Sequence, residues 1–176
     1  FSEVHASVLM SATLRPFEVT ADTLGMDDPE TLAFGLTFPR QNRRTFAVDA
    51  PPLFASARDD PEVQSVVAGV LEDAMTYAPG NLLAFFPSYA EAERYAGAVD
   101  RAVYLDEPGT PVQDLKEAFV DDDDAALFTS LWGTLTEGVS FDGDDARSVA
   151  VVGVPYPHLD DRTEAIQDAY DAAFDD

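Results

Sequence analysis

Two apolar runs, separated by a loop of small and hydroxyl residues, constrain the fold of this chain more than any other feature. Residues 125–132 and 148–154 have the length and composition of buried strands, and residues 133–143 between them carry glycines together with Thr134 and Thr136. Two buried strands that flank such a loop are typical of a ligand crevice at the carboxyl edge of a parallel sheet. Glycines let the backbone approach a phosphate or sugar, and hydroxyls add hydrogen bonds. The stretch therefore predicts a binding loop, with a plain connection between strands as the alternative.

The rest of the chain alternates between strand-like and helix-like segments. Apolar residues recur at helical spacing after Pro61, and Ser88 followed by Glu91 forms a capping box at the start of another helix. Strands are expected over residues 4–10, 82–86 and 102–105, and helices over residues 16–24, 61–76, 89–99, 111–120 and 163–174. Alternation of this kind predicts an α/β fold: a doubly wound, mostly parallel sheet with helices on both faces.

The charge balance is extreme: 34 acidic residues stand against 10 basic ones, and the formal net charge is −24. The acids are dispersed among periodic apolar positions and 46% of the residues are hydrophobic, which excludes an acidic disordered tail. A folded domain with this charge repels itself in dilute buffer, whereas molar salt shortens the Debye length to about 3 Å and screens the repulsion. We therefore expect a cytoplasmic protein of a salt-accumulating halophile, which loses structure below roughly molar KCl.

The composition also excludes several chemistries. The chain has no cysteine, so it holds no disulfide and no iron–sulfur cluster, and its two histidines, His5 and His158, are too far apart in sequence to favour zinc. Neither a G-x-G-x-x-G fingerprint nor a G-x-x-x-x-G-K-[ST] phosphate loop is present. No apolar stretch is long enough to span a bilayer. We predict no metal site in this chain and no membrane partner.

A negative net charge ordinarily argues against nucleic acid, because phosphate contacts supply much of the affinity through counterion release. At molar salt that contribution is largely lost for any protein, so arginines, hydrogen bonds and stacking would have to carry DNA binding. Arg40, Arg43 and Arg44 form the only basic cluster. A solvated loop that pairs with nearby aspartates is the alternative interpretation of this cluster.

Three segments, in this order and spacing, resemble the carboxyl-terminal half of the XPD/DinG family of superfamily-two DNA helicases. LMSATLRP at residues 9–16 resembles helicase motif III, GNLLAFFPSY at 80–89 resembles the motif IV strand, and GTLTEGVSFDGDDARSVAVVGVPYP at 133–157 resembles motif V with the strand after it. FPRQNRR at 38–44 resembles the family's lead-in to the second motor domain. The resemblance implies a RecA-like fold that lacks its own phosphate loop.

The resemblance also implies domain boundaries and site residues. Residues 1–15 would end the first motor domain, with the motif III strand, and residues 16–176 would form the second RecA-like domain, truncated before motif VI. The residues that couple hydrolysis to domain movement would be Ser11, Ala12 and Thr13. ATP contacts would come from Glu137, Gly138, Ser140 and Asp142, and DNA contacts from Ser88, Tyr89, Trp132, Thr134 and Thr136.

Two of these assignments have an alternative. The family's motif V commonly reads E-G-x-D-F, whereas here Ser140 stands where the aspartate is usual, so Asp142 is the candidate replacement for that contact. Trp132, the only tryptophan, either stacks on a base or belongs to the core.

The function implied by the resemblance is that of the carboxyl-terminal motor domain of an ATP-dependent DNA helicase that acts in DNA repair. The first motor domain of the same polypeptide would complete the site for ATP and Mg²⁺, single-stranded DNA would cross both domains, and an iron–sulfur cluster would belong to the amino-terminal part. This chain alone would not hydrolyse ATP. Two other classes stay open: a stand-alone α/β module that binds a small ligand or regulates, and an acidic protein-interaction domain whose loops are only connections.

Overall fold

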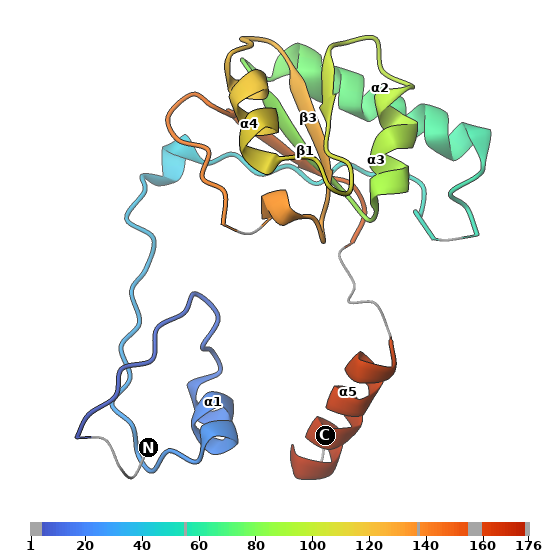
Figure 1. Cartoon of the computed structure of the whole chain (residues 1–176). Coiled ribbons are helices and arrows are strands. Elements are labelled where there is room, and N and C mark those ends of the chain that lie inside the picture. Colours follow the sequence, from blue (N-terminus) through green and yellow to red (C-terminus); the bar gives the residue numbers. More distant parts are fainter. Residues whose placement is uncertain (1–4, 55, 137, 155–159, 175–176) are drawn as a thin grey trace. The chain divides into compact units, whose positions relative to one another are not determined.

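The computed structural model describes residues 5–54, 56–136, 138–154 and 160–174. The chain divides into two compact units, Phe1–Ala47 and Val48–Asp176 (Figure 1). This division does not test the domain boundary expected after residue 15, which stays a prediction.

The first unit is mostly irregular. Its described residues contain one α-helix, α1 (Phe17–Leu24), and one turn of 3₁₀ helix, η1 (Arg40–Asn42). α1 lies where a helix is expected, over residues 16–24, and it ends at Gly25. The φ angle of this glycine is 62°, and its backbone N–H turns back to the carbonyl oxygens of the last turn. A residue without a Cβ adopts this left-handed conformation at no steric cost, which explains where the helix stops.

The strand expected over residues 4–10 is not formed in the part of it that the structure describes. Residues 5–10 pair with no other strand, and Val8 and Met10 are exposed. A strand is stable only when its backbone N–H and C=O groups meet those of a neighbour, and the described part of the first unit contains no other strand. An apolar run alone therefore did not suffice to predict a strand at this position.

The second unit is built on a four-stranded sheet in which every pairing is parallel. Its strands are β1 (Leu82–Phe86), β2 (Val103–Leu105), β3 (Ala126–Ser130) and β4 (Ser148–Val151), in the spatial order β2-β3-β1-β4. Leu82 pairs with Ala126 and Phe86 with Ser130, so β1 and β3 begin and end at the same level. The predicted parallel α/β sheet is confirmed.

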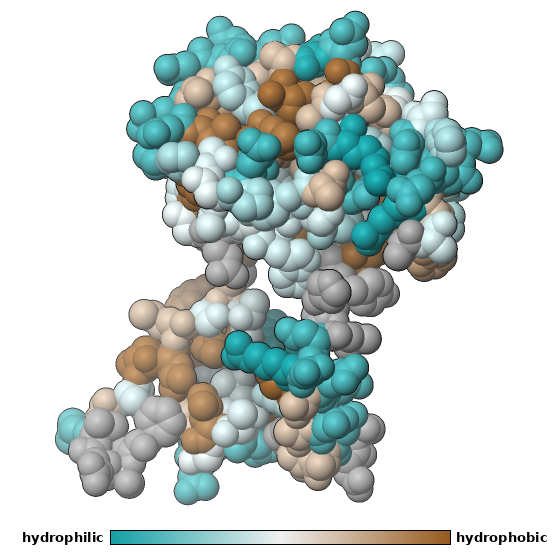
Figure 2. Space-filling view, turned by 45° about the vertical axis from the view of Figure 1, so that its right-hand side comes forward, coloured by the Kyte–Doolittle hydropathy of each residue, from teal (hydrophilic) through white to brown (hydrophobic). Residues whose placement is uncertain are grey.

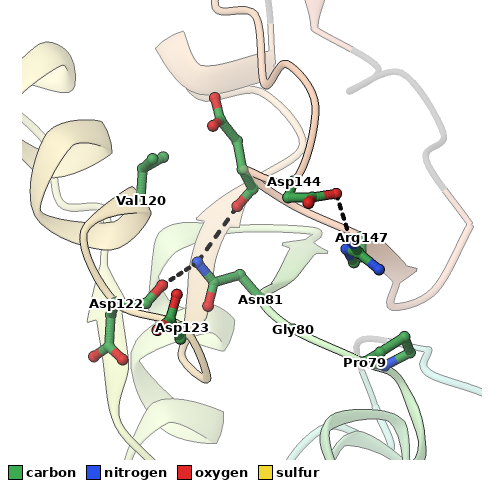
Figure 3. Close-up of a pocket in the computed structure, with 9 residues that line it drawn as sticks. Pro79, Gly80, Asn81, Val120, Asp122, Asp123, Asp144 and Arg147 are labelled. Atoms are coloured by element: carbon green, nitrogen blue, oxygen red, sulfur yellow. Dashed lines mark hydrogen bonds and ion pairs between the residues drawn. The ribbon is translucent and has the colours of Figure 1, made fainter.

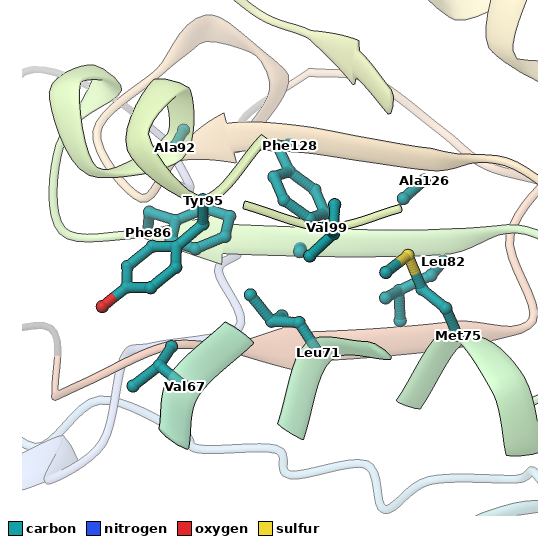
Figure 4. Packing of buried hydrophobic residues seen from close by; sticks show 11 residues of the cluster. Val67, Leu71, Met75, Leu82, Phe86, Ala92, Tyr95, Val99, Ala126 and Phe128 are labelled. Carbon is teal, nitrogen blue, oxygen red and sulfur yellow. The ribbon is translucent and has the colours of Figure 1, made fainter. Parts of the chain in front are cut away.

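Helices cover both faces of this sheet, as expected. One face packs against α2 (Pro61–Tyr77) and α3 (Tyr89–Ala96), and the other packs against α4 (Val112–Val120). Leu71 of α2 and Phe119 of α4 are almost completely buried, one on each side. Figure 4 shows the apolar side chains of α2 facing the aromatic rings that come from β1, α3 and β3. The apolar spacing in the sequence thus identifies the buried face of α2 correctly.

The ends of the helices follow local capping residues. The hydroxyl oxygen of Ser88 accepts a hydrogen bond from the backbone N–H of Glu91 at 3.2 Å, which is the expected cap of α3. α3 ends three residues before the expected position, because Gly97, a poor helix former, follows Ala96. A last helix, α5 (Asp161–Phe174), begins two residues before the expected start.

β4 differs from its prediction as a buried strand over residues 148–154. It lies at the edge of the sheet, next to β1 and not next to β3, and its outward side chains Val149 and Val151 are 62% and 55% exposed. The sequence cannot show that β1 inserts between β3 and β4, because strand order depends on long-range pairing. The loops that follow β1 and β3 are therefore neighbours, and these two strands replace β3 and β4 as the frame of the predicted crevice.

The amino edge of the sheet is fixed by one buried side chain, that of Asn81, which precedes β1. Its amide nitrogen donates to the carbonyl oxygens of Phe119 at 3.0 Å and Asp122 at 2.7 Å, and its amide oxygen accepts from the N–H of Ala125 at 2.9 Å. A shallow pocket of about 350 Å³ lies beside it (Figure 3). Four aspartates and Arg147 supply the charged part of its lining, and it lies at the edge opposite to that where the predicted site residues gather.

Polar side chains cover most of the visible face of the second unit, in agreement with the acidic composition (Figure 2). Among the described residues of this unit, four basic side chains form ion pairs with carboxylates: Arg94, Arg101, Lys116 and Arg147. The surplus of acids leaves most carboxylates without such a partner, so their mutual repulsion depends on the salt around the protein.

Candidate functional site

Predicted site residues from two separate segments meet at the carboxyl edge of the sheet. Ser88 and Tyr89 follow β1, and residues 131–136 follow β3, its paired neighbour. The backbone N–H of Leu131 donates to the carbonyl oxygen of Phe86 at 2.7 Å, which continues the pairing of the two strands into their loops. The polar ends of β1 and β3 therefore form one continuous surface.

The loop after β3 turns tightly back on itself. The N–H of Gly133 donates to the carbonyl oxygen of Ser130 at 2.9 Å, and the hydroxyl of Thr136 donates to the same oxygen at 3.0 Å. One turn of 3₁₀ helix, η2 (Thr134–Thr136), completes the bend. The hydroxyl of Thr136 is thus used within the loop, whereas Thr134 is exposed at its tip.

Tyr89 and the loop after β3 are in close contact. A Cβ atom at Gly133 would lie 2.8 Å from the hydroxyl of Tyr89 and 3.0 Å from the hydroxyl of Thr129, so no side chain fits there. Burial raises the pKa of Tyr89 above its ordinary value, and the negative charge of Asp106 adds to this, while the backbone of Thr134 acts in the opposite direction. The hydroxyl is therefore neutral at physiological pH and keeps its proton for donation.

Trp132 is 60% exposed, so the alternative that it belongs to the core is wrong. Its backbone N–H donates to the hydroxyl of Ser130 at 3.2 Å, while its indole stays accessible. Ser88 and Tyr89, which follow the paired strand β1 at the same edge, are half-buried and carry hydroxyl groups. An edge that combines an accessible indole with hydroxyl donors can stack on a planar ring and bind polar groups.

The predicted ATP contacts are spread along the connection from β3 to β4, which passes over α4. Gly138 has a φ angle of 80°, which favours glycine. The carbonyl oxygen of Ser140 accepts a hydrogen bond from the Nζ of Lys116 on α4, and this amine also lies 5.4 Å from the ring centre of Phe141. Ser140 is therefore held against the flank of α4. Glu137 lies outside the described residues.

Asp142 is not brought together with Ser88 and Tyr89. Its backbone N–H donates to the carboxylate of Asp145 at 3.0 Å, and Asp145 lines the pocket beside Asn81 at the amino edge. The connection between parallel strands must return from the carboxyl edge to the amino edge, and Asp142 lies near the end of that return. Its role as the replacement for the usual motif V aspartate stays a prediction.

The remaining predicted residues belong to the first unit. Ser11, Ala12 and Thr13 are exposed, and the hydroxyl of Ser11 accepts from the backbone N–H of Thr13 at 3.1 Å. The basic cluster is exposed too, and no ion pair involves it within the described residues: Arg40, Arg43 and Arg44. The alternative in which these arginines pair with nearby aspartates is therefore not seen in the described part of the chain.

Two residues of the carboxyl edge, Asp106 and Thr129, were not predicted from the sequence. Both are buried, and the hydroxyl of Thr129 donates to a carboxylate oxygen of Asp106 at 2.7 Å. A signal for Asp106 was present: an acidic residue directly after a short apolar strand lies at the carboxyl edge of a parallel sheet. Thr129 gave no such signal, because a threonine within a strand is ordinary.

Within the described part of the chain, no helix is both long and apolar enough to cross a bilayer. The same residues contain no group of three or more His, Asp or Glu side chains arranged to hold a metal ion.

A parallel β2-β3-β1-β4 sheet, with helices on both faces and its polar loops gathered at the carboxyl edge, defines a RecA-like α/β domain. The chain belongs to the helicase C-terminal domain family, whose model matches residues 71–176. This confirms the resemblance to the XPD/DinG helicases at the level of the family and the fold.

Individual relatives agree with this assignment. The chain is 25% identical to the XPD helicase subunit of the general transcription and DNA repair factor IIH of Schizosaccharomyces pombe, over 97% of this chain and 26% of that protein. It is 23% identical to the ATP-dependent DNA helicase DDX11 of Danio rerio, over 89% of this chain and 22% of that protein. A solved XPD helicase structure is similar over 67% of this chain and 22% of its own, with a TM-score of 0.58 and 25% identity. The chain thus spans about a quarter of the length of the curated relatives it matches.

Proposed function

We propose that this chain is the second RecA-like motor domain of an ATP-dependent DNA helicase and that single-stranded DNA binds across the carboxyl edge of its sheet. The observation that carries the proposal is the exposed indole of Trp132 at the end of β3, on the same edge of the sheet as Ser88 and Tyr89, which follow the paired strand β1. Bases of any sequence present a planar face, so one aromatic platform with hydrogen-bond donors next to it suits a single strand that moves.

Within this proposal each residue has a separate role. The indole of Trp132 stacks on one base, and the hydroxyl of Tyr89, which holds its proton, donates to a phosphate oxygen. Ser88 caps the amino-terminal end of α3, and the backbone N–H groups of that end can bind the same phosphate. Thr134 adds a hydroxyl at the tip of the loop, and Thr136 supports the loop from inside.

ATP requires more than this chain provides. The sequence has no phosphate loop, and its described residues form no metal-binding cluster, so they do not fit Mg²⁺-ATP on their own. We place the phosphate loop and the Mg²⁺ ligands in the first motor domain of the same polypeptide, and any iron–sulfur cluster in its amino-terminal part. The ATP contacts from the second domain would then be Gly138, Ser140 and Asp142, together with Glu137, which lies outside the described residues. Ser11 to Thr13 would connect hydrolysis to domain movement.

The proposal extends to the setting of the whole protein. Residues 1–15 end the first motor domain and residues 16–176 belong to the second. The protein acts in DNA repair in the cytoplasm of a salt-accumulating organism. The support for the last point is the net charge of −24, which a folded chain tolerates best where salt screens it.

Equilibrium binding of a fluorescent oligothymidine to the chain in molar KCl tests the proposed interface. Replacing Trp132 with Ala removes the stacking platform, and we expect the affinity to fall about tenfold or more, since stacking contributes roughly 1–3 kcal/mol per base. Tyr77→Ala is the matched control, because Tyr77 is an aromatic residue that is even more accessible (81% exposed) at the end of α2, at the amino edge. Equal affinities of the two variants would refute the proposed interface.

A further inference from the structure

Asp106 is a buried carboxylate that needs an explanation. It follows β2 directly, it is 1% exposed, and its backbone N–H donates to the carbonyl oxygen of Phe128 at 2.9 Å. Its carboxylate accepts the hydroxyl of Thr129, and no ion pair neutralises it within the described residues. Burying a carboxylate without a positive partner is unfavourable, so an apolar residue would give a more stable sheet.

Thr129 connects this carboxylate to the loop after β3. Its hydroxyl points at Asp106 on one side, and on the other side it stands 3.0 Å from the position that a Cβ of Gly133 would occupy. The carbonyl oxygen of Ser130, at 3.1 Å, and the hydroxyl of Tyr89, at 2.8 Å, close the remaining space around the same position. Three polar groups, the hydroxyls of Tyr89 and Thr129 and the carbonyl oxygen of Ser130, therefore enclose Gly133, so a shift of one of them changes the space left for the others.

The direction of the Thr129 hydroxyl is set by Asp106. A threonine hydroxyl that is free to rotate can donate to several acceptors, and the carbonyl oxygen of Ser130 lies 3.5 Å away as a weaker one. A charged acceptor at 2.7 Å is stronger than a neutral one, so the hydroxyl stays with Asp106. This leaves the oxygen of Ser130 to the N–H of Gly133 and the hydroxyl of Thr136, the two bonds that form the turn.

We propose that Asp106 and Thr129 are a positioning pair, which fixes the turn at Gly133 and thereby presents Trp132 in the orientation needed to stack on a nucleobase. The pair itself is buried and does not touch the DNA. Its effect passes through the enclosed backbone of Gly133 to the residue before it. The expected effect on DNA binding rests on the proposed function. The orientation of Trp132, in contrast, is a property of the protein without DNA.

The fluorescence of Trp132, the only tryptophan, reports directly on this positioning. Thr129→Val keeps the shape of the side chain and removes the hydroxyl. We expect a lower anisotropy of the indole emission in the free protein, about tenfold weaker binding of oligothymidine, and less quenching of Trp132 at saturating DNA. Thr129→Ser restores the hydroxyl and should return all three values toward those of the unaltered chain.

Two further variants separate positioning from general loss of stability. Val99→Ala removes buried methyl groups before β2, far along the chain from the loop, and should leave the quenching at saturation unchanged even though it destabilises the fold. Gly133→Ala keeps the pair intact but places a Cβ against Tyr89, and it should change the anisotropy and the quenching as Thr129→Val does.

Three results would overturn the inference: unchanged anisotropy and quenching in Thr129→Val, no recovery in Thr129→Ser, or unchanged quenching in Gly133→Ala. If the unaltered chain does not bind oligothymidine at all, the proposed function fails. The anisotropy of the free variants still decides whether Asp106 and Thr129 position Trp132, so the two failures are distinguishable.

Discussion

Replacing Asn81 with Ala should destabilise the second unit more than any exposed substitution of the same kind. The side chain is 3% exposed and makes three hydrogen bonds of 3.0 Å or shorter, to the backbone of Phe119, Asp122 and Ala125. These partners belong to the end of α4, to the turn after it, and to the residue before β3. One amide thus joins the start of β1 to the segment that leads into β3.

The size of the effect follows from these bonds. Each contributes about 1 kcal/mol net, and the buried N–H of Ala125, left without its acceptor, costs roughly 1–3 kcal/mol more. We expect a loss of about 4 kcal/mol in the free energy of unfolding, which is a large part of the roughly 5–15 kcal/mol that a domain usually has. Asn81→Asp should be at least as damaging, because it turns a donor facing two carbonyl oxygens into a buried, charged acceptor.

Urea unfolding at constant molar KCl, followed by circular dichroism, measures this difference. At a slope of about 2 kcal/mol per molar urea, the midpoint should fall by about 2 M. Asn42→Ala and Asn42→Asp are the matched controls, since Asn42 is exposed in η1. Midpoints for the Asn81 variants within error of the controls would refute the reasoning, since the amide would then contribute nothing that water does not replace.

Three other predictions concern the stability of the chain. Tyr95→Phe should raise the free energy of unfolding by about 1 kcal/mol, because the hydroxyl is buried without a hydrogen-bond partner among the described residues; a less stable variant in urea would contradict this. Burial and the charge of Glu91 raise the pKa of Tyr95, so the folded state holds its proton longer and stability should fall as pH rises above about 10, less steeply in the Phe variant. Lowering KCl from about 3 M to about 0.1 M should unfold the chain, because the Debye length grows from below 3 Å to about 10 Å; an unchanged melting temperature would count against a halophilic protein.

The elements that the sequence predicted correctly are those fixed by local patterns. α2 follows from apolar residues at helical spacing after Pro61, and the start of α3 follows from Ser88 and Glu91 three positions apart. Position 132 shows the limit of such reasoning. A tryptophan next to a buried strand fits the core or the surface equally well, and only the structure shows that its side chain is 60% exposed, directly before the turn at Gly133.

The features that were missed depend on contacts between distant segments. The exposed face of β4 results from the insertion of β1 beside β3, and a strand over residues 4–10 would need a pairing partner that no local pattern reveals. The position of Asp106 directly after β2 places it at the carboxyl edge, but its burial becomes evident only with its partner, Thr129. Where burial and strand pairing determine the structure, local sequence propensity predicts it less well than contacts between distant segments do.

The interactions of Lys116 within the chain affect how binding partners of this protein can be identified by cross-linking. It is the only lysine, and its amine is already occupied by the carbonyl oxygen of Ser140, the carboxylate of Asp145 at 3.5 Å and the ring of Phe141. Amine-directed cross-linkers and resins therefore have a single internal target, and reaction there would disturb the segment that returns to β4. Carbodiimide chemistry has 34 acidic side chains to use instead, so a binding partner is better mapped through the carboxylates.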